Sequence, residues 1–211
     1  THTIIAPQMS PIHFDFIEHA FRNQGYQLVV LPDTDAQAID EGLKYVNNDA
    51  CFPSIIVIGQ IMNALKSGKY DLNNTSIILS QTGGGCRASN YIGFMRKALK
   101  EAGMSHIPVI SLNALGLEGH PGFKFTVPFV HRGVMAILYG DLFMRVLYRT
   151  RPYEAKKGSA ERLYESLKKE AFRNIDNGSV TQFIQLCHKV VQAFDRLTLT
   201  EEVKPRVGIV G

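Results

Sequence analysis

A glycine-rich turn that carries a cysteine is the segment of this sequence best suited to chemistry. Residues 81–87 read Gln-Thr-Gly-Gly-Gly-Cys-Arg, and three consecutive glycines allow backbone conformations closed to other residues while leaving the Cys86 thiol uncovered. A helix is expected to begin directly after this turn, and its dipole together with Arg87 would stabilise a thiolate. A thiolate attacks electrophiles or binds metal, whereas a small cysteine buried under a tight turn would be inert.

Cys51 has a related setting. Pro53 follows it by two residues, and because proline fits the first turn of a helix, Cys51 is expected at or just before a helix N-terminus. Cys51 and Cys86 lie 35 residues apart, which is neither the paired spacing of a zinc ribbon nor that of a bacterial ferredoxin. The two thiols can share a site only if the fold brings both turns to one edge of a sheet.

The third cysteine has the pattern of a structural residue. Apolar side chains recur at spacings of three and four, which predicts the apolar stripe of an amphipathic helix. The stripe comprises Val180, Phe183, Ile184, Cys187, Val190, Val191 and Phe194. Cys187 is therefore expected to be buried among apolar neighbours.

The common nucleotide and hydrolase motifs do not occur in the sequence. It contains no Gly-x-Ser-x-Gly elbow, no Walker A loop and no Gly-x-Gly-x-x-Gly fingerprint, so hydrolase, nucleotide triphosphatase and dinucleotide-binding functions lack their usual support. The glycine turn can still act as an anion nest. We therefore expect Gly83, Gly84, Gly85 and Arg87 to form the cofactor-binding turn.

Strand-like and helix-like segments alternate through the first half of the chain. Strands are expected over residues 2–9, 26–31, 76–80 and 107–112, and helices over residues 11–23, 35–46, 53–66 and 88–102. This alternation predicts an α/β fold with a parallel sheet of about four strands and flanking helices, Rossmann- or flavodoxin-like. In such a sheet, ligands bind outside the carboxyl ends of the strands.

The second half of the chain has a helical pattern. Helices are expected over residues 129–150, 158–174 and 180–198, and they form a mainly helical C-terminal region. We divide the chain into an α/β cysteine-bearing domain over 1–127, a helical region packing on it over 128–203, and the start of a following strand over 204–211. The apolar end of the chain indicates a fragment of a larger protein.

The composition limits the classes of partner. Of 211 residues, 45% are hydrophobic and 20% are charged, and the net charge is only +4, too small to indicate nucleic acid binding. The longest apolar stretches are short or interrupted by charges, so no membrane association is expected. Three cysteines and no signal peptide indicate a cytoplasmic protein.

The two cysteine phrases together resemble those of a known family. Residues 48–53, Asn-Asp-Ala-Cys-Phe-Pro, followed by residues 81–91 around Cys86, are similar to the cysteine motifs of the 2-hydroxyacyl-CoA dehydratase component proteins. The resemblance is strongest to the related domain of the large 2-hydroxyglutaryl-CoA dehydratase activator proteins. It covers most of the chain and is densest over residues 45–99.

The resemblance implies an iron–sulfur function. In that family such cysteines ligate a [4Fe-4S] cluster, so Cys51 and Cys86 become two of its ligands, the third lying outside this chain unless the cluster has been lost. An ATPase activator domain, in the same polypeptide, would supply low-potential electrons, an acyl-CoA would be the substrate, and the chain alone would be inactive. The alternatives are a cluster-free scaffold that docks an ATPase partner, and a flavodoxin-like module that binds an anion or small molecule.

Overall fold

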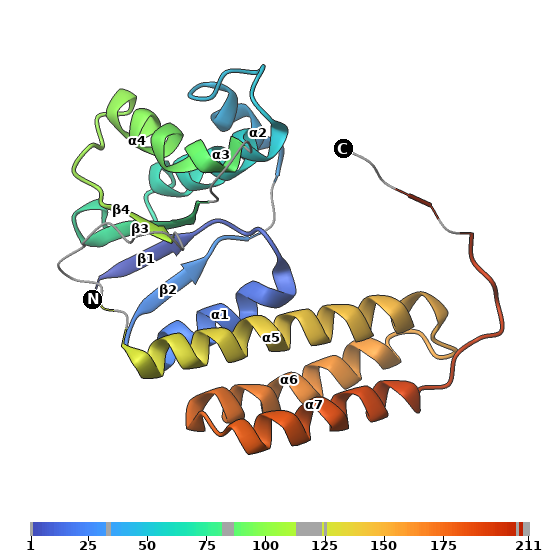
Figure 1. Ribbon diagram of the computed structural model, residues 1–211. Coiled ribbons are helices and arrows are strands. Elements are labelled where there is room, and N and C mark those ends of the chain that lie inside the picture. Colours follow the sequence, from blue (N-terminus) through green and yellow to red (C-terminus); the bar gives the residue numbers. More distant parts are fainter. Residues whose placement is uncertain are drawn as a thin grey trace. The chain divides into compact units, whose positions relative to one another are not determined.

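The computed structural model describes residues 2–32, 35–81, 87–112, 124, 126–205 and 207–208, with only the backbone described at Arg87 and Ala88. The chain divides into two compact units, Thr1–Val130 and His131–Gly211. In the described residues, the first unit combines a sheet with helices and the second is built from helices (Figure 1).

The first unit contains the parallel sheet that the sequence predicted. Its described strands are β1 (Thr3–Ala6), β2 (Gln27–Val30), β3 (Thr75–Ser80) and β4 (Val109–Leu112), arranged in the order β2-β1-β3-β4. Every strand pair is parallel. The expected fold class is therefore confirmed, including the mainly helical C-terminal region.

Helices cover both faces of this sheet. They are α1 (Pro11–Asn23), α2 (Ala36–Leu43), α3 (Phe52–Lys66) and α4 (Tyr91–Glu101). Ile4 and Ile78 point to one face and share a buried cluster with Phe21 of α1, whereas Ile5 and Ile77 point to the other face and pack with α3 and α4. The strands are apolar on both sides because both sides are covered, as is usual for parallel sheets.

The second unit is built around aromatic contacts between three helices. They are α5 (Val127–Thr150), whose first turn belongs to the first unit, α6 (Ser159–Asn177) and α7 (Val180–Asp195). The ring centroids of Tyr139 and Phe183 lie 4.7 Å apart and join α5 to α7. Those of Phe143 and Tyr164 lie 5.5 Å apart and join α5 to α6. Edge-to-face aromatic packing therefore links α5 to both other helices.

Helix α6 is capped at both ends by side chains from neighbouring segments. Its N-cap is Gly158, which has no side chain to cap the helix, and the Glu154 carboxylate instead accepts the backbone N–H groups of Ala160, at 2.8 Å, and Gly158. These hydrogen bonds lower the pKa of Glu154. At the other end, Arg132 donates to the carbonyl of Ile175 at 3.1 Å. The first N–H groups and the last carbonyl groups of a helix have no partner within it and need such hydrogen bonds.

Several element boundaries differ from the sequence expectations. The first strand, expected over residues 2–9, ends at Ala6 because Pro7 has no N–H to donate to a ladder. The helix expected over residues 88–102 begins with a 3₁₀ turn, η2 (Arg87–Asn90), before α4. Lys204, Pro205, Val207 and Gly208 have no strand structure, and the other residues of the expected final strand lie outside the described residues.

None of the helices in the described part of the chain combines the length and the apolar character needed to cross a bilayer.

Candidate functional site

The carboxyl ends of β1 and β3 form the crevice in which this topology places a ligand. From β1 the chain continues through α1 to β2, and from β3 it continues through α4 to β4, on the opposite side. The two connections diverge, and the backbone between the strand ends is left accessible. We call the edge of the sheet at which the strands end the carboxyl edge.

The loop after β1 is held by side chains at this edge. The backbone N–H of Gln8 donates to Oε1 of Gln60 in α3 at 3.0 Å, and Oε1 of Gln8 accepts the N–H of Ser10 at 3.1 Å. The Ser10 hydroxyl lies 2.8 Å from Nδ1 of His13 and makes no bond to the first backbone N–H groups of α1. Four polar side chains therefore fix the shape of this loop.

Gln81 connects both ends of the segment that carries Cys86. Its backbone N–H donates to the carbonyl of Leu112 at 3.0 Å, which continues the pairing of β3 with β4. Its side-chain oxygen accepts the Ser111 hydroxyl at 3.0 Å, and its amide nitrogen donates to the carbonyl of Ser89 in η2. Gln81 thus links β4 to η2 across the base of the glycine turn. The sequence analysis did not identify this role, although a glutamine directly after a buried strand was a signal for it.

The glycine turn itself is not part of the described structure. Gly83, Gly84, Gly85 and Cys86 lie outside the described residues, as does the side chain of Arg87. The backbone of Arg87 starts η2, which leads directly into α4. A helical segment therefore follows the turn, and the roles expected for these five residues stay predictions.

Cys51 occupies the N-cap position of α3. Its backbone is extended, with φ −60° and ψ 138°, and Pro53 stands in the first helical turn. The completely buried Ser54 donates its hydroxyl to the Cys51 carbonyl at 2.7 Å and its N–H to the same oxygen at 2.9 Å. The Cys51 thiol is half-buried and makes no capping hydrogen bond to the helix. The described backbone therefore places this sulfur at the positive end of a 15-residue helix.

The position of α3 depends on two glycines. A Cβ on Gly59 would lie 1.8 Å from the carbonyl oxygen of Ala38 in α2, and a Cβ on Gly42 would lie 2.1 Å from the carbonyl oxygen of Ile55 in α3. No side chain fits at either distance, so α2 and α3 pack backbone against backbone. The sequence analysis missed this contact, although a glycine inside an apolar helical segment usually has a packing reason.

Helix α3 starts at the carboxyl edge. The chain leaves β2 at this edge and must return to the opposite edge to begin β3, because the two strands run in the same direction. Figure 1 shows α3 beginning on the side at which β1 and β2 end, and the bond between Gln60 and Gln8 fixes α3 beside the end of β1. Cys51 and the end of β3, from which the chain runs to Cys86, therefore lie at the same edge of the sheet.

Cys187 lies in the middle of α7, in the second unit. Its thiol is half-buried rather than fully buried, and burial raises its pKa. The expected stripe is partly wrong, because Val180, Ile184 and Val191 are 55%, 51% and 41% exposed. The buried apolar residues of α7 are Val190 and Phe194, which the prediction contained, and Leu186, which it did not. The face that packs on α5 and α6 is rotated from the predicted one, and Cys187 lies at its margin.

No group of three or more histidine, cysteine, aspartate or glutamate side chains that could hold a metal occurs within the residues described. A cubane cluster needs several thiolate ligands. Cys51 is the predicted ligand whose surroundings the structure describes, and Cys86 is not described.

The comparisons identify one segment of the chain. No curated protein matches it and no solved structure matches it. Residues 11–72 match a family model described as the CoA enzyme activase uncharacterised domain. This segment runs from the start of α1 past the end of α3 and includes Cys51. Residues 11–72 are therefore similar to a CoA enzyme activase domain, which supports over this segment the resemblance to the 2-hydroxyglutaryl-CoA dehydratase activators.

Proposed function

We propose that this chain is an iron–sulfur electron-transfer or reductase module of the 2-hydroxyacyl-CoA dehydratase type. The observation that carries the proposal is the position of Cys51, at the N-cap of α3 within the segment that matches a CoA enzyme activase domain. Cys51 and Cys86 are two ligands of a [4Fe-4S] cluster at the carboxyl edge. When bound, the cluster would carry low-potential electrons received from an ATP-driven activator domain toward reduction of an acyl-CoA.

The chemistry of Cys51 fits a cluster ligand. Iron–sulfur clusters are held by cysteine thiolates, and the N-terminus of a helix stabilises a negatively charged ligand. The Cys51 side chain does not cap the helix, and its backbone is fixed by Ser54. Gly83, Gly84, Gly85 and Arg87 line the cluster in this proposal, and Arg87 would offset its negative charge. Cys187, inside α7 and with a pKa raised by burial, is not a ligand in this proposal, and the third cysteine comes from outside this chain.

Gln81 is a positioning residue in this proposal. It joins Ser111 of β4 to Ser89 of η2 and so fixes both ends of the segment that bears Cys86. A thiolate ligand must be held near its binding geometry before the metal arrives, because ordering it on binding lowers affinity. Loss of the Gln81 side chain should therefore accelerate release of iron without removing a ligand.

Anaerobic reconstitution of the full-length protein, which would also supply the third cysteine, with ferrous iron and sulfide tests the proposal. Iron and acid-labile sulfide are measured in the unsubstituted protein and in Cys51→Ser, Cys86→Ser and Cys187→Ser, with the fold of each checked by circular dichroism. We expect Cys51→Ser and Cys86→Ser to lose most of the bound iron, because a serine hydroxyl is a poor iron ligand at neutral pH. Cys187→Ser is the matched control and should keep it. Equal iron loss in all three, or no iron in the folded unsubstituted protein, would rule the cluster out and favour the scaffold function.

A second candidate is a flavodoxin-like module that binds a small molecule or anion at the same edge without a cluster. The hydrogen-bonded loop around Gln8, Ser10 and His13, beside the point at which the strand order reverses, favours it. Titration of the iron-free protein with inorganic phosphate, followed by backbone amide NMR shifts, distinguishes the two. Saturable shifts at Ser10 and Gln81 would support this candidate, and their absence would count against it.

A further inference from the structure

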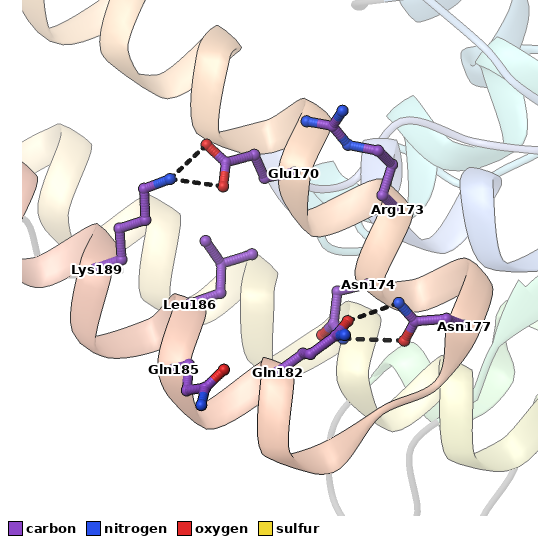
Figure 2. A pocket seen from close by; sticks show the side chains of 8 residues that line it. All are labelled: Glu170, Arg173, Asn174, Asn177, Gln182, Gln185, Leu186 and Lys189. Carbon is purple, nitrogen blue, oxygen red and sulfur yellow. Dashed lines mark hydrogen bonds and ion pairs between the residues drawn. The ribbon is translucent and has the colours of Figure 1, made fainter.

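A pocket of about 360 Å³ lies between α6 and α7, in the second unit. Leu186 forms its base, with Glu170 and Lys189 on one side and Asn174 and Gln182 on the other (Figure 2). All of its lining residues belong to these two helices. The pocket is therefore independent of the carboxyl edge and of the cysteines proposed there.

One wall of the pocket is built from hydrogen-bonded amides. Asn174 is only 4% exposed; its oxygen accepts the Tyr139 hydroxyl at 2.7 Å, and its nitrogen donates to Oδ1 of Asn177 at 3.2 Å and to the carbonyl of Ser179 at 3.0 Å. Asn177 in turn donates to Oε1 of Gln182 at 2.7 Å. The oxygen of Gln182 is thereby engaged, and its amide nitrogen remains as a hydrogen-bond donor at the pocket.

The charges around the pocket leave one cation available. Lys189 donates to both carboxylate oxygens of Glu170, at 2.8 and 2.7 Å, and so neutralises it. Arg173, exposed on α6, makes no ion pair or hydrogen bond in the described part of the chain. Gln185 adds a second amide, which has no hydrogen-bond partner within the described residues. The pocket therefore offers a guanidinium and two amide groups, and it has one net positive charge.

These groups select a particular kind of ligand. A guanidinium binds carboxylates and phosphates through paired hydrogen bonds. A phosphate dianion would leave one negative charge uncompensated beside Glu170, whereas a carboxylate monoanion matches the net charge. Leu186 supplies an apolar base, so the ligand should have a short hydrocarbon part. We propose that this pocket binds a short-chain organic carboxylate, with its carboxylate on Arg173 and its hydrocarbon chain on Leu186.

Titration of the 211-residue protein with n-butyrate tests the assignment, with side-chain and backbone amide NMR shifts as the readout. We expect saturable shifts at Gln182, Gln185 and Leu186 with a Kd on the order of 1 mM, as for a ligand of few atoms. Arg173→Gln should weaken binding about tenfold because it removes the charge-assisted pair. Arg145→Gln, an exposed arginine on α5, is the matched control and should leave the Kd unchanged.

A variant that should tighten butyrate binding distinguishes an effect on the ligand from damage to the fold. Glu170→Gln removes the carboxylate that neutralises Lys189, so butyrate should bind about threefold more tightly, whereas damage to the fold would only weaken binding. Butyramide, which lacks the charge, should produce no saturable shift. Butyrate binding that is unaffected by Arg173→Gln, tighter binding of inorganic phosphate, or tighter binding of N-acetylvaline, which has the carboxylate of a peptide end, would overturn the proposal.

Discussion

Cys51 and Cys187 have opposite environments in the two units of this molecule. Cys51 precedes the first turn of α3, beside the backbone N–H groups of a helix N-terminus. Cys187 lies inside α7, next to Tyr139, and burial raises its pKa. The fold thus exposes one sulfur to a positive helix end and places the other where a charge is disfavoured. Whether a cysteine lies at the N-terminus or in the interior of a helix therefore affects how readily it can serve as a thiolate ligand.

The first prediction concerns the contact between α2 and α3, which positions the helix that begins after Cys51. Gly59→Ala places a methyl group against the Ala38 carbonyl, where the Cβ distance would be 1.8 Å, and should lower the free energy of unfolding by about 3 kcal/mol because the backbones must separate. Gly93→Ala in α4 is the control, since outside the nearby backbone of its own helix no described atom lies within 4 Å of its Cβ position, and it should raise stability by about 0.5–1 kcal/mol. Urea denaturation measures both. Equal effects would show that the α2–α3 contact does not require glycine at position 59.

The second prediction concerns the polar contact in the unit that contains Cys187. Tyr139→Phe leaves the buried Asn174 oxygen without its donor and should lower the free energy of unfolding by about 2 kcal/mol. Tyr148→Phe, on the exposed side of α5, should change it by less than about 0.5 kcal/mol. Thermal and urea denaturation measure both variants. A Tyr139→Phe protein as stable as the control would mean that the Asn174 network adds nothing to the fold.

The third prediction examines the hydrogen bond between Gln81 and Ser111. Gln81→Leu leaves the Ser111 hydroxyl, in a residue only 2% exposed, without its acceptor, and should cost about 1.5 kcal/mol. Adding Ser111→Ala should recover part of this loss, since removal of both partners leaves no unpaired group. The double-mutant cycle is measured by urea denaturation. Strictly additive effects would argue that the two side chains do not interact.

The fourth prediction sharpens the contrast between the thiols. Cys187→Ala should lower the free energy of unfolding by about 1 kcal/mol through a small cavity and leave any bound iron in place. On the iron-free protein at neutral pH, iodoacetamide should modify Cys187 more slowly than Cys86, because the raised pKa of Cys187 keeps it protonated. Mass-spectrometric mapping of the adducts measures this. Preferential modification of Cys187 over both other cysteines would reverse the assignment of core and chemical cysteines.

The same pKa shift has a consequence for stability. The Cys187 thiol ionises at higher pH in the folded protein than in the unfolded chain, because burial raises its pKa. The contribution of the protonated Cys187 thiol to the free energy of unfolding is therefore fully present below the pKa of the unfolded chain, about 8.5. It is lost as the pH rises through the pKa of the folded protein. Unfolding measured between neutral and alkaline pH should show a decline that is smaller in Cys187→Ala.

The sequence by itself determined the fold class and the position of Cys51. Alternating apolar segments with turn residues between them specify a parallel sheet covered on both faces, because only that arrangement buries strands that are apolar on both sides. Pro53 determined the start of α3 because it is accommodated in a first helical turn. Both properties depend on residues close together in the chain, and the sequence contains them directly.

Only the tertiary structure decided which residues meet across long separations. Three features depend on how two elements are oriented against each other. They are the contact of Gly59 with Ala38, the hydrogen bond between Gln81 and Ser111, and the choice of the buried side of α7. Helix periodicity defines an apolar stripe but leaves its angle open by tens of degrees when apolar residues lie on more than half of the surface. Packing fixes that angle, and it placed Cys187 at the margin of the buried face rather than at its centre.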